Sequence, residues 1–374
     1  MRPGVYFVDG GIACAEGALY AGCRFFAGYP ITPATSIVEW MAERLPQEQG
    51  YYVQMEDEIA SMAAIIGASW AGGKAMTATS GPGFSLMQEN LGYAYLTETP
   101  LVVVDAQRSG PSTGQATMPG QQDVMQARYG THGDIAPIAF APWSVQEMFD
   151  FTVHAFNYSE QFRTPVLVMA DGEVSYMREP LQIPKQGALP ITNRRSLTSK
   201  HPRTGEIFLR YEMPKFGDGH DLLVTGSAHR PTGVRDYSPR YHRATIHWLF
   251  EKQKEAGKAL HQEGLDVESR HLDHAEAVIV SFGAAARPSY QAVLAARKTG
   301  ESIGFVRLKT LWPFPEEQLA RLFKDLKRIF VVEMNMGMMV REIERVGCEA
   351  QVIGIPKVGG EIHRSSEILQ QIRG

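Results

Sequence analysis

The chain has 374 residues, of which 44% are hydrophobic, so it can bury a large core, and its length predicts two domains. A formal net charge of −4 leaves no basic excess, which argues against nucleic acid as a partner. No apolar run approaches the ~18 residues of a membrane-spanning helix and the N-terminus lacks a signal pattern, so we expect a cytoplasmic protein without a membrane partner.

The first informative element is an apolar strand from Arg24 to Ala27, which ends in the loop Gly28-Tyr29-Pro30-Ile31-Thr32-Pro33. Each proline fixes its own φ and pushes the residue before it toward extended geometry, so Thr32 is held in place. Open α/β sheets bind ligands at the carboxyl ends of their parallel strands. The loop is therefore a candidate site, and the alternative is a rigid turn between a strand and a helix.

The segment from Met55 to Gly73 predicts a helix that is apolar nearly all round and therefore buried. Acidic residues occupy its first turn, where the helix dipole favours negative charge, and this accounts for Glu56 and Asp57. Glu58 lies at the edge of the buried run, where a carboxylate is costly without a partner. Glu58 is therefore the candidate functional acid.

A third region combines a strand, a sharp turn and a helix. The pattern predicts a strand from Lys74 to Thr79, a turn at Ser80-Gly81-Pro82-Gly83 and a helix from about Ser85 to Thr97. Similar alternation of short apolar strands and helices extends over residues 1–185. We therefore expect a doubly wound parallel sheet, the hallmark of an α/β fold.

The next strand, Pro100 to Ala106, is followed by Gln107 and Arg108, which we expect at its carboxyl end. A guanidinium there suits a carboxylate, because its planar fork makes two parallel charge-assisted hydrogen bonds. The alternative is an ion pair at the surface. Arg108 is the second candidate site residue.

Residues 186–272 differ in composition, with scattered prolines and basic pairs, and predict a linker or extended arm with one helix near Tyr241 to Gly257. Alternation returns over residues 273–374 and predicts a second α/β domain. Its expected strands are 277–282, 303–308, 328–333 and 349–355, and its expected helices are 288–299, 316–326 and 337–345.

The motifs, in this order, resemble the alpha subunits of the 2-oxoacid:ferredoxin oxidoreductases, most closely those that act on 2-oxoglutarate. The segments that carry the resemblance are 29–33 (YPITP), 55–60 (MEDEIA), 79–83 (TSGPG), 107–114 (QRSGPSTG), 130–134 (GTHGD), 164–171 (TPVLVMAD), 216–219 (FGDG), 224–229 (VTGSAH) and 307–315 (RLKTLWPFP). The resemblance implies a pyrimidine-type thiamine-diphosphate-binding domain over residues 1–185, a linker over 186–272 and a transketolase C-terminal-like α/β domain over 273–374.

The resemblance also implies roles for individual residues. Thiamine enzymes place a carboxyl group of raised pKa beside N1′ of the aminopyrimidine, and Glu58 takes this role, because desolvation on an apolar helix raises a carboxyl pKa. Arg108 pairs with the carboxylate of the 2-oxoacid, and Thr32 donates a hydrogen bond to the substrate unless it caps the following helix. Cofactor contacts are expected from Tyr29, Pro30, Ile31, Gly81, Pro82 and Gly83. Substrate contacts are expected from Ser112, Thr113, Gly114 and Gln115.

Thiamine diphosphate is bound through magnesium, for which thiamine enzymes use a GDG motif followed by paired asparagines. The triplet Gly217-Asp218-Gly219 is present, but no asparagine follows until Asn335 and no strand directly precedes the triplet, so we interpret it as a turn. Three cysteines, Cys14, Cys23 and Cys348, form no CxxC pair that could hold an iron–sulfur cluster or zinc. No metal ligands are predicted, and the chain is expected to supply half of a thiamine diphosphate site.

The resemblance implies partners that supply the rest. A beta subunit would carry the Mg²⁺ half-site and an iron–sulfur cluster, with [4Fe-4S] clusters confined to partner subunits, and gamma and ferredoxin-like delta subunits are left open. CoA is the expected cosubstrate and ferredoxin the electron acceptor. The expected assembly is a dimer of heteromers that decarboxylates 2-oxoglutarate oxidatively to succinyl-CoA, with reversal to CO2 fixation open.

Alternatives remain at this stage. Relatives that act on 2-oxoglutarate often carry a lysine where this chain reads Gly114-Gln115-Ala116-Thr117-Met118, so branched-chain, aryl or other 2-oxoacids stay open as substrates. The missing asparagine pair argues against a free-standing thiamine enzyme. A non-catalytic assembly subunit is opposed by the presence of Thr32, Glu58 and Arg108 together.

Overall fold

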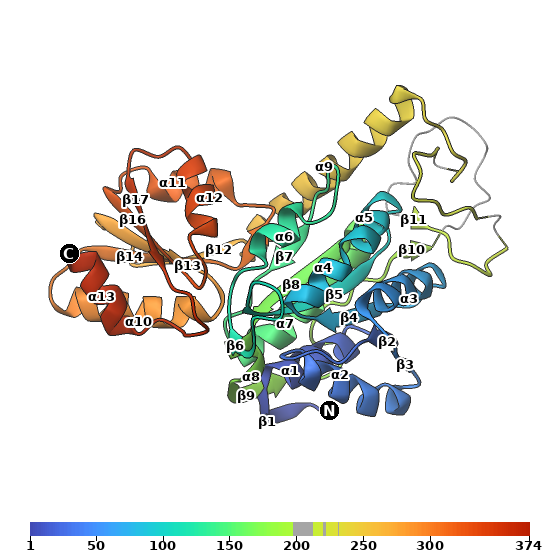
Figure 1. Ribbon diagram of the computed structural model, residues 1–374, viewed down its shortest axis with the longest axis horizontal. Coiled ribbons are helices and arrows are strands. Elements are labelled where there is room, and N and C mark those ends of the chain that lie inside the picture. The colour runs from blue at the N-terminus through green and yellow to red at the C-terminus, as the bar shows by residue number, and fades with distance from the viewer. Residues whose placement is uncertain (197–211, 220–221, 231) are drawn as a thin grey trace.

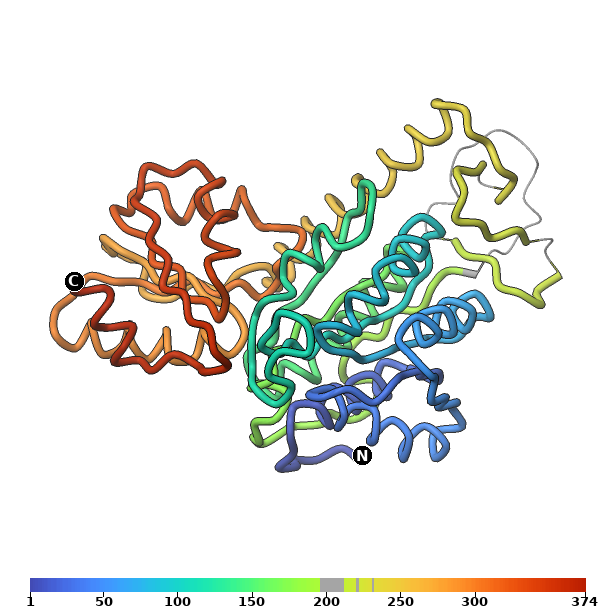
Figure 2. The backbone as a smooth tube through the Cα atoms, viewed as in Figure 1, coloured from blue at the N-terminus to red at the C-terminus, as the bar shows by residue number. Residues whose placement is uncertain are grey.

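The computed structural model describes residues 1–196, 212–219, 222–230 and 232–374. Two α/β units lie side by side, and the long helix α9 (Pro239–Gln262) runs diagonally along the N-terminal unit toward the C-terminal one (Figure 1). The backbone trace in Figure 2 shows that the two chain ends lie in different units. The predicted linker falls partly outside the described residues.

The N-terminal unit is built on an eight-stranded sheet. Its parallel strands are, in spatial order, β7 (Ile138–Phe140), β8 (Pro165–Asp171), β5 (Leu101–Ser109), β4 (Ala75–Thr79), β2 (Phe25–Gly28) and β3 (Tyr51–Gln54). Two strands pair antiparallel: β6 (Gln115–Pro119) with β5, and β15 (Thr310–Trp312) with β7. Strands β4, β5 and β8 are buried along their whole length, as expected for parallel strands covered on both faces.

Helices cover both faces of this sheet, which confirms the predicted doubly wound fold. They are α1 (Gly10–Tyr20), α2 (Thr35–Arg44), α3 (Glu58–Trp70), α4 (Gly81–Leu86), α5 (Gln88–Leu96), α6 (Val124–Tyr129), α7 (Val145–Phe162) and α8 (Gly172–Tyr176), with a short 3-10 turn at Pro46–Glu48. Apolar side chains of α1, α2 and α7 belong to one hydrophobic cluster, and those of α3, α5 and α6 to another. The two clusters lie on opposite faces because side chains alternate along the strands between them.

Two short ribbons complete this part of the chain. Strands β1 (Gly4–Asp9) and β9 (Arg178–Ile183) pair antiparallel, and β10 (Arg195–Ser196) pairs parallel with β11 (Glu212–Met213). Helix α9 is fastened to the N-terminal unit by Lys252, whose Nζ donates to Glu98 Oε2 at 2.6 Å and to the Arg163 carbonyl at 2.9 Å. The helix predicted at 241–257 therefore exists, is longer than expected, and packs against the sheet domain.

The C-terminal unit is a five-stranded sheet in the order β12-β14-β13-β16-β17. Only β12 (Val267–Arg270) is antiparallel; the others are β13 (Ala277–Ser281), β14 (Ile303–Leu308), β16 (Arg328–Glu333) and β17 (Gln351–Pro356). Its helices are α10 (Ala286–Lys298), α11 (Glu316–Phe323), α12 (Met338–Arg345) and α13 (Ser365–Arg373), with a 3-10 turn at Gly283–Ala285. The strand predictions for β14 and β16 match to the residue, whereas α13 was not predicted.

Strand pairing crosses the predicted domain boundary in both directions. Strand β12 precedes residue 273 and still joins the C-terminal sheet, while β15 follows it and joins the N-terminal sheet. Trp312 of β15 is buried and its Nε1 donates to the Val124 carbonyl at 3.0 Å, at the start of α6. The division at 1–185, 186–272 and 273–374 stays a prediction, and these pairings show how closely the units interlock.

Two details differ from the expected elements. The turn expected at 80–83 forms the first turn of α4, where Pro82 is tolerated because the N–H that it lacks would have no partner within the helix. The helix expected over 85–97 is divided into α4 and α5 at Met87. Strand β5 continues through Ser109, because β6 folds back on it. None of the described helices is both long enough and apolar enough to cross a membrane.

Candidate active site

The predicted site residues meet at one edge of the N-terminal sheet. The loop after β2, the start of α3 after β3, the start of α4 after β4, and the last residues of β5 all lie at the carboxyl ends of parallel strands. Apolar side chains of α3, α4 and α5 belong to the same hydrophobic cluster, and Figure 1 shows these helices near one another. The sheet thereby brings together Thr32, Glu58, Gly81 and Arg108, which are far apart in the sequence.

Glu58 is the first residue of α3, and its side chain is only 4% exposed. Asp57 before it is the N-cap, since its Oδ1 accepts the Ala60 N–H at 2.7 Å, so the dipole interpretation of Asp57 becomes a capping one. Burial raises the pKa of Glu58, the neighbouring Asp57 carboxylate adds to this, and the Glu58 N–H and Arg108 oppose it. Among the described residues, no other group donates a hydrogen bond to the Glu58 carboxyl.

Gly83 is required directly beneath this carboxyl group. A Cβ at position 83 would lie 2.3 Å from Glu58 Oε1 and 2.2 Å from Thr79 Oγ1, closer than side-chain atoms approach. The hydroxyl groups of Thr79 and Ser80 are buried without a hydrogen-bond partner in the described part of the chain. The turn therefore leaves a carboxyl group and two hydroxyl groups available in a confined space.

Arg108 is buried within β5 rather than placed after the strand, which corrects the expectation and excludes a surface ion pair. Its Nη1 donates to the Thr32 carbonyl at 2.8 Å. Its Nε is buried and has no acceptor among the residues that the structure describes. The guanidinium is thus fixed at one nitrogen and has another free to bind an acceptor.

Thr32 contributes its carbonyl oxygen, not its hydroxyl, to the observed contact with Arg108. Helix α2 has Ala34 at its N-cap and shows no side-chain cap, so the alternative that Thr32 caps this helix is wrong. The role of the Thr32 hydroxyl toward a substrate stays a prediction. In the same loop, Tyr29 and Pro30 are exposed and Ile31 is half-buried.

The residues from Ser112 to Gln115, predicted to contact the substrate, lie on the hairpin between β5 and β6. Ser112, Thr113, Gly114 and Gln115 are exposed, and no hydrogen bond among the described residues links them to Arg108. The hairpin instead contacts the C-terminal unit, where a Cβ on Gly360 would lie 2.7 Å from Gln115 Oε1. Gln115 therefore lies against the C-terminal unit, and the substrate contacts expected from this hairpin stay a prediction.

Sequence reasoning missed two carboxyl groups beside this cluster. Asp105 is fully buried in β5, and Asp123 stands immediately before α6. Arg108 acts on both electrostatically, and the Gly81 N–H is directed at both. A signal existed for Asp105, since a charge inside the apolar run Leu101 to Ala106 is costly unless it serves a purpose.

Exposed apolar side chains border the site. Tyr29, Ile59 and Leu86 are exposed by 40%, 47% and 47%, and come from the loop after β2, from α3 and from α4. A rim of this composition is typical of a protein–protein interface.

The GDG triplet lies in a turn, as predicted, with Gly217 and Gly219 at positive φ and Asp218 paired to Lys215 at 3.3 Å. Within the described ranges, no group of three or more His, Cys, Asp and Glu side chains is arranged to hold a metal ion. Burial raises the pKa of both Cys14 and Cys23 to about 12, so these thiols stay protonated.

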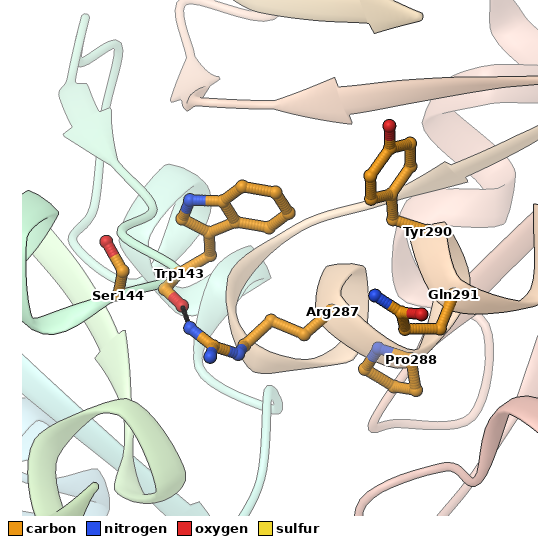
Figure 3. A pocket seen from close by; sticks show the side chains of 6 residues that line it. All are labelled: Trp143, Ser144, Arg287, Pro288, Tyr290 and Gln291. Carbon is orange, nitrogen blue, oxygen red and sulfur yellow. Dashed lines mark hydrogen bonds between the residues drawn. The ribbon is translucent and has the colours of Figure 1, made fainter. Parts of the chain in front are cut away.

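A cavity of about 430 Å³ lies elsewhere, between the two units. Figure 3 shows Trp143 and Ser144 on one side, and Arg287, Pro288, Tyr290 and Gln291 of α10 on the other. The Arg287 guanidinium is already bound, because Nη1 donates to the Trp143 carbonyl at 3.0 Å and Nη2 to Glu179 Oε1 at 2.6 Å. None of the predicted site residues lines this cavity, which is a junction between the units.

Comparison with known families covers both units. The profile of the family described as pyruvate flavodoxin/ferredoxin oxidoreductase, thiamine diphosphate-binding, matches residues 16–247. The profile of the pyruvate:ferredoxin oxidoreductase core domain II matches residues 275–368.

Individual relatives agree with these profiles. The 2-oxoglutarate synthase subunit KorA of Methanocaldococcus jannaschii is 50% identical over 374 residues, covering 99% of this chain and 100% of that one. The KorA subunit of Methanothermobacter marburgensis is 49% identical over 376 residues, covering 99% and 98%. A solved 2-oxoglutarate:ferredoxin oxidoreductase from Magnetococcus marinus, with 2-oxoglutarate, coenzyme A and succinyl-CoA bound, has a TM-score of 0.90 and 31% identity, covering 99% of this chain and 65% of that chain.

The matched profiles cover all strands of the N-terminal sheet and all but β12 of the C-terminal one, and the relatives match along nearly the whole chain. The suspected resemblance is confirmed: the chain belongs to the alpha subunits of the 2-oxoacid:ferredoxin oxidoreductases, in the branch of the 2-oxoglutarate synthase subunit KorA.

Proposed function

We propose that this chain is the catalytic alpha subunit of a 2-oxoglutarate:ferredoxin oxidoreductase. The reaction joins 2-oxoglutarate and CoA into succinyl-CoA, releases CO2 and passes two electrons to oxidised ferredoxin. The observation that carries the proposal is the buried Glu58 carboxyl, which lies directly over Gly83 and is influenced by a buried Arg108 with a free Nε. The identity of about 50% to KorA subunits supports the choice of substrate.

Glu58 holds and transfers the proton that activates the cofactor. A general acid needs to keep its proton near neutral pH, and burial raises the pKa of Glu58 in that direction. When bound, thiamine diphosphate supplies the carbanion that adds to the 2-oxo carbon and releases CO2. The arrangement of Glu58 at a helix start, fixed by the Asp57 cap, keeps its carboxyl oriented toward the turn at Gly83.

Arg108 anchors the 1-carboxylate that every 2-oxoacid carries. Its Nη1 is committed to the Thr32 carbonyl, so Nε remains to bind an oxygen of the substrate. A buried guanidinium N–H without an acceptor favours binding of an oxygen such as that of a carboxylate, since its hydrogen bond is otherwise unmade. The Thr32 hydroxyl, carried on the same loop, donates a further hydrogen bond to the substrate.

The residues around the turn fit the pyrimidine half of thiamine diphosphate. Glu58 provides the carboxyl group that the ring requires, and the buried hydroxyls of Thr79 and Ser80 lack partners that a polar ligand would provide. Gly81, Pro82 and Gly83 allow close approach, and Tyr29, Pro30 and Ile31 complete the apolar side of the site.

A partner subunit completes the site. We infer a beta subunit that holds the diphosphate, Mg²⁺ and a [4Fe-4S] cluster, because this chain offers Glu58 and Arg108 but its GDG triplet is a turn tied to Lys215. The exposed rim of Tyr29, Ile59 and Leu86 suits such an interface. Gamma and ferredoxin-like delta subunits, CoA binding and a dimer of heteromers complete the proposed assembly.

Two assays test the proposal. The assembled complex, supplied with CoA and ferredoxin, is expected to show its highest kcat/KM for 2-oxoglutarate in a panel with pyruvate, a branched-chain 2-oxoacid and phenylglyoxylate. A preference for a branched-chain or aryl 2-oxoacid would replace the substrate but keep the chemistry. No turnover of any 2-oxoacid by an intact complex would leave the chain an assembly subunit.

Calorimetric titration of the isolated chain tests the half-site separately. We expect no tight magnesium-dependent binding of thiamine diphosphate by this chain alone, and tight binding once the beta subunit is added. A tight one-to-one isotherm with the isolated chain would contradict a shared site.

A further inference from the structure

A pair of carboxyl groups lies beside the candidate site, and no step described so far uses it. Asp105 projects from the middle of β5, and Asp123 from the residue before α6, so two elements bring them together across the edge of the sheet. Their side chains lie within hydrogen-bonding range of each other. Asp105 is fully buried, and the Oδ2 atom of Asp123 is buried as well.

Apart from the Gly81 N–H, no described residue outside the pair donates a hydrogen bond to it. Asp105 Oδ1, Asp105 Oδ2 and Asp123 Oδ2 have no hydrogen-bond partner among the described residues when both groups are ionised. Two buried carboxylates in contact repel each other, so a proton between them is the stable arrangement. Burial and then the Asp123 carboxylate raise the pKa of Asp105 well above 3.8, whereas burial raises the pKa of Asp123 to about 6 and the hydrogen bond from Asp105 opposes this.

The surroundings of the pair connect it to the site. The Gly81 N–H, at the start of α4, is directed at both carboxyl groups, and Arg108 is the cation that acts on both. Arg108 also acts on Glu58, which starts α3. The Arg108 side chain passes close to Gly81, since a Cβ there would lie 3.8 Å from Nε. Three carboxyl groups and one guanidinium therefore form a single electrostatic cluster.

We propose that Asp105 and Asp123 are a positioning pair that shares one proton, with Asp105 as donor and Asp123 as acceptor. The remaining single negative charge balances Arg108 and holds the Gly81 N–H, and with it the turn on which the Glu58 carboxyl rests. The pair acts through Arg108 and Glu58 and does not touch the substrate. Its effect on kinetics rests on the function proposed above, whereas its protonation state does not.

The geometry makes the charge of the pair the decisive quantity. With one proton shared, the pair and Arg108 are neutral together, so Arg108 opposes the raised pKa of Glu58 less than an uncompensated guanidinium would. If the pair lost its charge, the uncompensated guanidinium would favour the ionised form of Glu58, since a nearby cation stabilises a carboxylate. If the pair carried two charges, it would compete with the substrate carboxylate for Arg108.

Infrared spectroscopy of the full-length chain tests the shared proton directly. The difference spectrum between the wild type and Asp105→Asn at neutral pH is expected to contain the carbonyl band of a buried protonated carboxyl group. Asp150→Asn is the matched control, because burial raises the pKa of Asp150 to about 6 as well, but this residue lies on α7 beside Gln146 and outside the cluster. Absence of the band in the wild type at neutral pH would overturn the proposal, whatever the enzyme does.

Kinetics of the assembled complex test the positioning role. Each single variant, Asp105→Asn or Asp123→Asn, keeps one charge and one internal hydrogen bond, so it should lower kcat/KM much less than the double variant, which removes the charge. We expect at least about a tenfold difference between the double and single variants, corresponding to about one unit in the pKa of a neighbouring group. The pH profile of kcat should shift toward lower pH for the double variant. If single and double variants fall equally, or if the profile does not shift, the pair is only structural.

Stability against pH gives a third readout that needs no activity. Folding raises the pKa of both aspartates above their ordinary value of 3.8, so between about pH 4 and 6 the folded chain binds more protons than the unfolded chain, and stability falls as the pH rises. Asp105→Asn removes one of these groups and should flatten the slope in denaturant unfolding. An unchanged slope would contradict a raised pKa in the pair.

Discussion

Each of the two sheets of this protein has a buried carboxyl group near the carboxyl end of a strand, but the two groups differ in their hydrogen-bond partners. In the C-terminal unit, Glu333 ends β16, and its oxygens accept the Met339 N–H at 2.9 Å and the Val340 N–H at 3.1 Å from the start of α12. In the N-terminal unit, no described residue other than Glu58 itself donates a hydrogen bond to the Glu58 carboxyl, and the buried Arg108 Nε has no acceptor among the described residues.

The contrast shows what distinguishes a structural charge from one available for chemistry. A buried polar group is ordinarily satisfied, because an unmade hydrogen bond carries the full cost of desolvation. Glu333 obeys this rule and ties a helix to a strand. The Arg108 Nε and the hydroxyl groups of Thr79 and Ser80 depart from it beside Glu58, so this place has binding capacity that the described residues do not use.

The largest expected effect is at Glu58. Glu58→Gln should leave assembly intact but lower kcat by a factor of about 100 or more, because an amide cannot carry the proton that general acid–base catalysis requires. Steady-state kinetics of the assembled complex, with assembly checked by gel filtration, measure this. Glu333→Gln is the matched control. Near-normal turnover in an intact Glu58→Gln complex would remove Glu58 from the mechanism and weaken the contrast between the sheets.

Arg108→Ala should lower kcat/KM for every 2-oxoacid alike, through a loss of about 2–4 kcal/mol in transition-state stabilisation. The reason is that the guanidinium pairs, in a buried place, with the carboxylate that all of these substrates share. The same substrate panel measures it. Arg287→Ala, which removes an arginine that also donates to a backbone carbonyl but lies at the junction of the units, should leave the ranking and the rates unchanged. An Arg108→Ala enzyme that spared some substrates would show that Arg108 is not the common anchor.

Glu333→Gln should act on stability instead of catalysis. The amide oxygen of Gln can still accept one of the two backbone N–H groups, but its NH2 group faces the other, which loses its acceptor, and this costs about 1–3 kcal/mol in the free energy of unfolding. Denaturant unfolding of the variant measures the loss, while kcat/KM of the folded complex should equal the wild-type value. A loss of activity without a loss of stability would mean that the C-terminal sheet also contributes to the chemistry.

The smallest expected effect is on the hairpin that bridges the two units. Gln115→Ala and Met118→Ala should change the ratio of kcat/KM values between 2-oxoglutarate and the other 2-oxoacids by about fivefold, which corresponds to about 1 kcal/mol. These side chains lie beside Gly360 and do not contact the common anchor Arg108, so they should affect substrates unequally. Thr117→Ala on the same strand is the control. If both variants scaled all substrates equally, the hairpin would not select the substrate.

The sequence was sufficient for much of the fold. Strands such as β14 and β16 are continuous apolar runs between turn residues, so their limits follow from local pattern. Glu58 was also predictable, because an acidic residue at the start of a buried apolar helix is evident from the sequence alone. Arg108 was identified by its place after an apolar run, although the strand proved to extend through it.

The remaining features depend on contacts between distant segments. The pairing of β15 with β7, and of β6 with β5, cannot be read from the pattern of one segment, because it depends on the position of the partner strand in the folded chain. For the same reason the sequence could not show that Gln115 and Met118 lie against Gly360 of the C-terminal unit.

Local pattern, then, specifies which segments become strands and helices, because backbone propensity and hydrophobic periodicity act over a few residues. It also marks Glu58 as a costly charge. Only the folded sheet decides that Arg108 reaches the Thr32 carbonyl, that Gly83 lies beneath Glu58, and that Asp105 meets Asp123. These pairs are separated by many residues and meet because parallel strands place their carboxyl ends at one edge, where charge, burial and hydrogen bonding are set jointly.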